Sequence, residues 1–142
     1  MKKILFTFLI GALSCTIARG MNVATKQLFT LARKGFLKKE VQLRKRIQKL
    51  INLGAQVNEY DDCGKTPLHY AAEYGWENVA KGLLEVGANP DLFDYTHKTA
   101  REIAQTNLHD PVIAVLDAYE VLQRQAENDA VDALLCLACD KK

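Results

Sequence analysis

Apolar residues in the middle of the chain recur at helical spacing and are interrupted by glycine at regular places. Two such runs end at Gly75 and Gly87. Their spacing predicts two short amphipathic helices, each ended by a glycine in the left-handed conformation. The apolar positions are Leu68, Ala71 and Ala72 in the first helix and Val79, Leu83 and Leu84 in the second.

The sequence also predicts where the first helix starts. Thr66 is a favourable N-cap, because its hydroxyl can accept a hydrogen bond from a backbone N–H of the first turn. Pro67 follows at the first helical position, where a missing N–H costs nothing. Gly64 precedes them and allows the chain to reverse in the loop before the helix.

The pattern repeats with a period of 33 residues. The segment 53–58 (LGAQVN) recurs as 86–91 (VGANPD), and the segment 64–68 (GKTPL) recurs as 97–101 (HKTAR) at the same offset. Two separate markers in one register indicate a repeat architecture.

The repeat resembles the ankyrin family, whose signature T-P-L-H-x-A is matched by residues 66–71. The resemblance implies an all-α solenoid of stacked helix-turn-helix units. It also implies that His69 has a structural role and bonds the threonine at the helix start. The repeat motif comprises Gly64, Thr66, Pro67, Leu68, His69, Ala71, Ala72, Gly75, Leu83, Leu84, Gly87 and Ala88.

Degenerate units are predicted on both sides of the full repeat, as expected at the ends of a stacked array. We divide the chain into a unit at 24–58, the full repeat at 59–91, a unit at 92–124 and a helical tail at 125–142. The first unit has an elongated second helix at about 38–52. In the third unit Thr99 and Glu102 form a capping box. No glycine or proline follows Pro111, so either this last helix runs on or a separate tail helix follows. In both cases we expect an apolar stripe at Val131, Leu134, Leu135 and Ala138 to cover the open end of the stack.

Residues 1–20 have the pattern of a secretory signal peptide. Two lysines precede ten almost wholly apolar residues, half of the about 20 that a membrane-spanning helix needs. Ala18 and Gly20 predict cleavage before Met21, and the compact basic start is typical of bacteria. We therefore expect an exported protein, periplasmic or secreted. The alternative is a lipoprotein anchored through Cys15, although the residues before Cys15 match that motif poorly.

Charge is unevenly distributed along a chain of net charge +2. Residues 21–50 contain nine Lys or Arg against one acid, whereas residues 51–142 contain seven against sixteen acids. The stretch 38–51 is either a solvated outer helix face or a basic patch for an acidic partner or an anionic lipid surface. Nucleic acid is not expected as a partner, since the stretch has no interleaved aromatic residues.

The sequence offers little catalytic or metal-binding chemistry. His97 and His109 have no nucleophile or second histidine at a useful spacing, and no phosphate-binding glycine loop or nucleophile elbow occurs. Cys136 and Cys139 form a C-x-x-C pair, but at the end of a helical pattern rather than at a helix start. We predict no enzyme activity, no cofactor and no metal, with a small thiol oxidoreductase as the rival hypothesis.

The resemblance to ankyrin repeats implies a non-enzymatic module that binds another protein through its loop tips and the concave face of its first helices. Acids beside aromatic anchors on this surface would favour a partner with a basic surface. The candidate partner-binding residues are Tyr60, Asp61, Asp62, Tyr70, Glu73, Tyr74, Trp76, Phe93, Asp94, Tyr95 and His97.

Overall fold

The computed structural model describes the backbone of residues 21–34 and 40–139, with side chains to Val131 except at Glu40 and Val41. Six helices occupy this part of the chain and it contains no strand, so the all-α prediction is confirmed there. The predicted signal peptide, Cys15, and the side chains of Cys136 and Cys139 lie outside the described residues. The helices are α2 (Val23–Lys34), α3 (Glu40–Asn52), α4 (Pro67–Glu73), α5 (Glu77–Glu85), α6 (Ala100–Thr106) and α7 (Asp110–Cys139).

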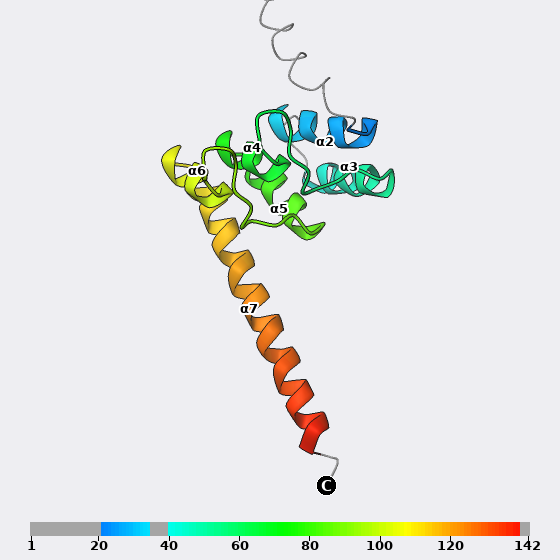
Figure 1. The fold of residues 1–142 in the computed structure, drawn as a ribbon, viewed down its shortest axis with the longest axis vertical. Helices are drawn as coiled ribbons and strands as arrows, with labels where there is room; N and C mark the ends of the chain where they lie inside the picture. The colour runs from blue at the N-terminus through cyan, green and yellow to red at the C-terminus, as the bar shows by residue number, and fades with distance from the viewer. Residues whose placement is uncertain (1–20, 35–39, 140–142) are drawn as a thin grey trace, which may run out of the picture.

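The helices form three antiparallel pairs stacked side by side in two rows (Figure 1). In one row α4 contacts both α2 and α6, and in the other α5 contacts both α3 and α7. The first row packs closely because each of its helices contributes a fully buried alanine: Ala32, Ala71 and Ala104. Larger side chains, among them Phe29, Ile47, Leu68 and Leu83, fill the space between the rows. The predicted helical solenoid is therefore confirmed.

Glycines end the helices of the full repeat as predicted. Gly75 follows α4 with φ +69° and Gly87 follows α5 with φ +88°. In the third unit the residue 33 positions after Gly75 is Leu108, which keeps the left-handed backbone with φ 58°. An L-residue in this region costs roughly 1–2 kcal/mol, so the third unit stores strain that its glycine-containing neighbour avoids.

Leu108 therefore gives a testable prediction about stability. Its side chain is 83% exposed, so Leu108→Gly removes left-handed strain while losing little packing. We expect the variant to be more stable by about 0.5–1 kcal/mol, after allowing for the greater entropy of unfolded glycine. Thermal melting checks this. Leu53→Gly is the matched control, since Leu53 is also exposed but has ordinary backbone angles, and it should lower stability.

The last helix settles the choice between one continuous helix and a separate tail. α7 is a single helix of 30 residues, so the proposed unit boundary at 124/125 lies inside it. Only its first part packs on the stack, through Val112 and Leu116, and the rest points away from the body (Figure 1). Val131 is 54% exposed. The apolar stripe that begins at Val131 was expected to cover the open end of the stack, and for Val131 this expectation is wrong. The side chains of Leu134, Leu135 and Ala138 lie outside the described residues.

Candidate protein-binding face

The loop before α4 is held by a buried carboxylate. Asp61 is only 3% exposed, and its Oδ1 accepts hydrogen bonds from the backbone N–H groups of Cys63 and Lys65, both at 3.0 Å. Its Oδ2 accepts a 2.6 Å bond from the Tyr70 hydroxyl on α4. Asp61 thus ties both the loop and the following helix together.

The next loop repeats the arrangement 33 residues later. Asp94 is 5% exposed, and its Oδ1 accepts from the backbone and hydroxyl of Thr96 and from the backbone of Lys98. Burial alone would raise the pKa of Asp94, but these hydrogen bonds outweigh burial and hold the pKa below its ordinary value. The ionised carboxylate is therefore a structural part of the loop.

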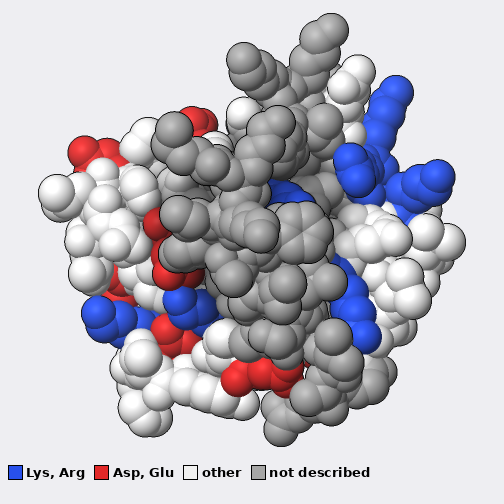
Figure 2. Space-filling model, turned by 90° about the horizontal axis from the view of Figure 1, so that it is seen from above, with Lys and Arg blue, Asp and Glu red and all other residues white. Residues whose placement is uncertain are grey.

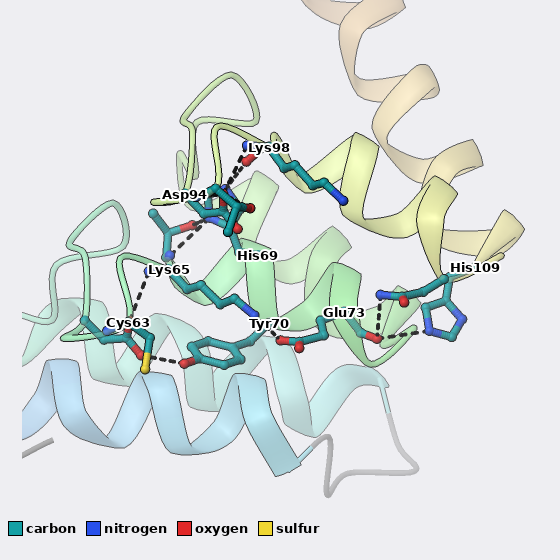
Figure 3. Close-up of polar contacts among 12 residues, drawn as sticks. Cys63, Lys65, His69, Tyr70, Glu73, Asp94, Lys98 and His109 are labelled. Atoms are coloured by element: carbon teal, nitrogen blue, oxygen red, sulfur yellow. Dashed lines mark hydrogen bonds and ion pairs between the residues drawn. The ribbon is translucent and has the colours of Figure 1, made fainter. Parts of the chain in front are cut away.

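His69 connects the two loops (Figure 3). Its Nδ1 accepts from the backbone N–H of Thr66 at 3.1 Å and lies 2.7 Å from the Thr66 hydroxyl. Its Nε2 lies 3.0 Å and 3.2 Å from the carbonyl oxygens of Leu92 and Lys98. Because both carbonyl oxygens are acceptors, Nε2 must carry a proton. Nδ1 accepts from the Thr66 N–H and so carries none, which makes the ring neutral. The predicted structural role of His69, with a bond to Thr66, agrees with this geometry.

The neutral state of His69 predicts a pH dependence. Burial lowers the pKa of His69 below 6.5, against the opposing influence of Asp94. When a group has a lower pKa in the folded protein than in the unfolded chain, it stabilises the fold at any pH above its unfolded pKa. This contribution is lost as the pH falls toward the folded pKa. We therefore expect the melting temperature to fall as pH drops from about 6.5 toward the lowered pKa. Melting of the wild type and His69→Gln between about pH 7.5 and 5.5 checks this: the variant should have the shallower slope, and equal slopes would contradict the assignment.

Three of the predicted partner-binding residues are in fact buried. The structure corrects Asp61, Tyr70 and Asp94, which are 3%, 5% and 5% exposed and serve the internal bonds described above. Loop acids were expected to face solvent, but here the loop backbone needs their oxygens as acceptors. Charge reversal at Asp61 or Asp94 would therefore break hydrogen bonds that hold the fold itself.

The other candidates lie where a partner could reach them. Tyr95, Phe93, Tyr74 and Trp76 are 63%, 56%, 45% and 37% exposed. His97 is exposed, and Tyr60, Asp62 and Glu73 are half-buried. His97 takes the left-handed position that Gly64 occupies one repeat earlier, with φ 57° against 68°. The Tyr95 ring covers Gly64 so closely that a Cβ there would overlap it, which brings the two loop tips together.

Cations that the sequence reading did not single out also line this face. The Arg33 guanidinium lies 5.3 Å from the centre of the Tyr70 ring and the Lys65 ammonium 5.5 Å from it. Lys65 also pairs with Glu73 at 2.8 Å (Figure 3). Burial and the hydrogen bond to Asp61 raise the pKa of Tyr70 well above its ordinary value. Two of the acids behind the expectation of a basic partner are therefore buried, and Glu73 is paired, so the expectation rests mainly on Asp62.

The remaining charges divide between the two ends of the stack. In Figure 2 most described Lys and Arg gather at the right, the side on which α2 and α3 lie, and most Asp and Glu lie at the left and below. On α3, Lys45, Arg46 and Lys49 are exposed, while Arg44 reaches Glu85 on α5 at 3.0 Å. The described residues contain no cluster of His, Cys, Asp or Glu suited to a metal ion. No helix in the described ranges is long and apolar enough to cross a membrane.

The family model for ankyrin repeats, in three copies, matches residues 38–142. The chain is an ankyrin-repeat protein. The ankyrin chain is 37% identical over 90 residues to the E3 ubiquitin-protein ligase hecd-1 of Caenorhabditis elegans, covering 61% of this chain and 3% of the ligase. It is 35% identical over 82 residues to mouse NF-kappa-B inhibitor zeta, covering 58% and 11%.

A shorter relative is ankyrin repeat protein R664 of Acanthamoeba polyphaga mimivirus. It is 32% identical over 74 residues, which cover 52% of this chain and 46% of the viral protein. In each case the ankyrin chain spans less than half of the relative. The likeness is therefore to the repeats of these proteins. Ankyrin repeats form a protein–protein interaction fold and carry no catalysis of their own.

Proposed function

We propose that this ankyrin-repeat chain is exported and that it holds another protein with its two loop tips and the adjoining face of α4. The observation that carries the proposal is the pairing of rigid loops with exposed aromatic residues. Asp61 and Asp94 fix the loops from inside, and Phe93, Tyr95 and Tyr74 remain exposed outside. A preorganised loop loses little entropy on binding, and aromatic side chains are common anchors.

Export is supported by residues 1–20, which combine a basic start with an apolar run too short to span a membrane. Two versions of the function follow: a periplasmic adaptor or inhibitor, and a secreted effector. N-terminal sequencing of the protein from the periplasm and from the medium distinguishes them by the compartment in which a chain beginning at Met21 accumulates. Palmitate labelling abolished by Cys15→Ala would instead support the lipid-anchored alternative.

Site-specific photo-crosslinking tests the binding face in cells that make the protein. We expect a photoreactive residue at Phe93 to crosslink to another protein. The matched control is Lys49, exposed on α3 at the outer side of the stack. Crosslinks from Lys49 but not from Phe93 would assign binding to the basic helix and contradict the proposal. The circular dichroism spectrum and melting temperature of both variants verify that each has folded.

A further inference from the structure

An apolar groove runs between α5 and α7 on the outer side of the stack. It encloses about 370 Å³. Leu84 of α5 lines one wall, and Val115, Ala118 and Leu122 of α7 line the other. Glu77 and Glu85 lie at its α5 edge. Leu122 is 65% exposed, so the groove carries apolar surface that the single chain leaves uncovered.

The apolar wall continues along α7 beyond the body of the protein. Tyr119, Leu122, Ala126 and Ala130 follow Val115 at steps of three or four residues and so share one face of the helix. The sequence continues this spacing at Ala133 and Leu137. Every residue from 121 to 131 is exposed. At 1.5 Å per residue, the 30 residues of α7 extend about 45 Å.

The end of α7 is apolar on more than one face. Of residues 130–139, nine are apolar and only Asp132 is charged. A helix that is apolar all round is normally buried, and contact with one helix would cover only one of its faces. The groove has one wall from α5 and one from α7, so it can cover two faces of an apolar helix at once.

We infer that two copies of this chain associate through antiparallel α7 helices, with the end of each α7 lying in the α5–α7 groove of the other copy. A two-fold axis near Ala126 places Leu122 opposite Ala130. It likewise places Tyr119 opposite Ala133, so that large residues meet small ones. Because the same surface serves both copies, the contact closes after two chains.

Charge favours a second copy over a lipid surface. Residues 117–132 carry five acids against Arg124 alone, so an anionic membrane would repel this part of α7. Two of the acids, Asp117 and Glu120, pair with Arg101 of α6, and Glu120 also pairs with Arg124. These pairs reduce the repulsion between two α7 helices.

The area of the contact predicts a weak dimer. With the axis at residue 126, the two α7 helices overlap over residues 113–139, which is about 40 Å. A helix about 12 Å wide presents about 500 Å² to its neighbour over this length, and the α5 wall adds to this. Two copies thus bury about 1,000 Å² or slightly more, the lower end for a specific interface. We expect a dissociation constant of about 10–100 µM.

Sedimentation of the full chain from about 1 to 200 µM tests the dimer. The wild type should move from monomer to dimer over this range. Leu122→Glu should raise the dissociation constant at least tenfold, whereas Val121→Glu should change it less than twofold. The two residues are adjacent and 65% and 58% exposed, but Val121 lies about 100° away around the helix. Neither side chain supports the monomer's core.

A disulfide test checks the register of the helices. In a background in which all four native cysteines, Cys15, Cys63, Cys136 and Cys139, are replaced by serine, oxidised Ala126→Cys should form a covalent dimer through residue 126, because the two-fold axis brings its copies together. Arg124→Cys, on the opposite side of the helix, should not. A chain that stays monomeric, a dimer insensitive to Leu122→Glu, or flotation of the chain with phosphatidylcholine vesicles would each overturn the inference.

Discussion

Replacing Asp61 by alanine is expected to lower the free energy of unfolding by about 3 kcal/mol. The substitution removes the acceptor for two backbone N–H groups and for the Tyr70 hydroxyl. The Asp61 side chain is buried, so water cannot freely replace these bonds, and bonds to a charged acceptor are each worth about 1.5–3 kcal/mol. In a repeat stack of this size, the melting temperature should fall by roughly 10 °C.

The neighbouring acid provides the control for Asp61. Asp62 is half-buried, and Asp62→Ala should change stability by less than about 0.5 kcal/mol. Urea unfolding of both variants against the wild type gives the comparison. A loss for Asp61→Ala no larger than for Asp62→Ala would show that the buried carboxylate does not hold the loop.

His69→Ala is expected to be similarly damaging, with a loss of about 3–4 kcal/mol. The imidazole accepts from Thr66 at the start of α4 and bonds the carbonyl oxygens of Leu92 and Lys98 in the following loop. Its removal leaves buried backbone groups unsatisfied and opens a cavity between two repeats. The damage should therefore include the third helix pair, which relies on this link to the second.

His109 offers a contrast for this measurement. It makes one bond of 3.1 Å, from Nε2 to the Glu73 carbonyl oxygen, and is half-buried. We expect His109→Ala to cost about 1 kcal/mol. Chemical denaturation gives both values, and hydrogen exchange of α6 shows whether the third pair opens first in His69→Ala. Equal losses in the two variants would contradict the bridging role of His69.

The sequence predicted the helical repeat because its decisive residues act locally. Thr66 and Pro67 start α4, and Gly75 and Gly87 end α4 and α5, with no help from distant parts of the chain. The buried positions Leu68, Ala71 and Ala72 follow from helical spacing alone. These features depend on backbone geometry that short segments specify by themselves.

The face of the protein was harder to predict because burial depends on the folded loops. Asp61 and Asp94 look like solvent-exposed turn residues until the loop backbone closes around them. One signal was available: both acids stand five residues before the threonine that starts a helix, at the same 33-residue offset. An acid kept in both copies of a repeat suggests a structural role more than a binding role.

The course of α7 was left open by the sequence for a different reason. A helix with no glycine or proline after Pro111 can continue or break, and local propensity does not decide how far it packs. The left-handed backbone of Leu108 and His97 could not be predicted from the sequence either. Both residues stand where the full repeat has glycine, and residues other than glycine adopt this conformation uncommonly. Backbone bonds within their own turns hold both: the His97 N–H donates to the Asp94 carbonyl oxygen, and the Leu108 N–H donates to the Gln105 carbonyl oxygen.

Hydrogen exchange on the complex tests the central claim most directly, once crosslinking at Phe93 has supplied the partner. The loops at 59–65 and 92–98 and the exposed end of α4 should exchange more slowly in the complex than in the free chain. Slowed exchange confined to α3, or to α7 beyond Glu120, would place the partner elsewhere and contradict the proposal that the loop tips bind it.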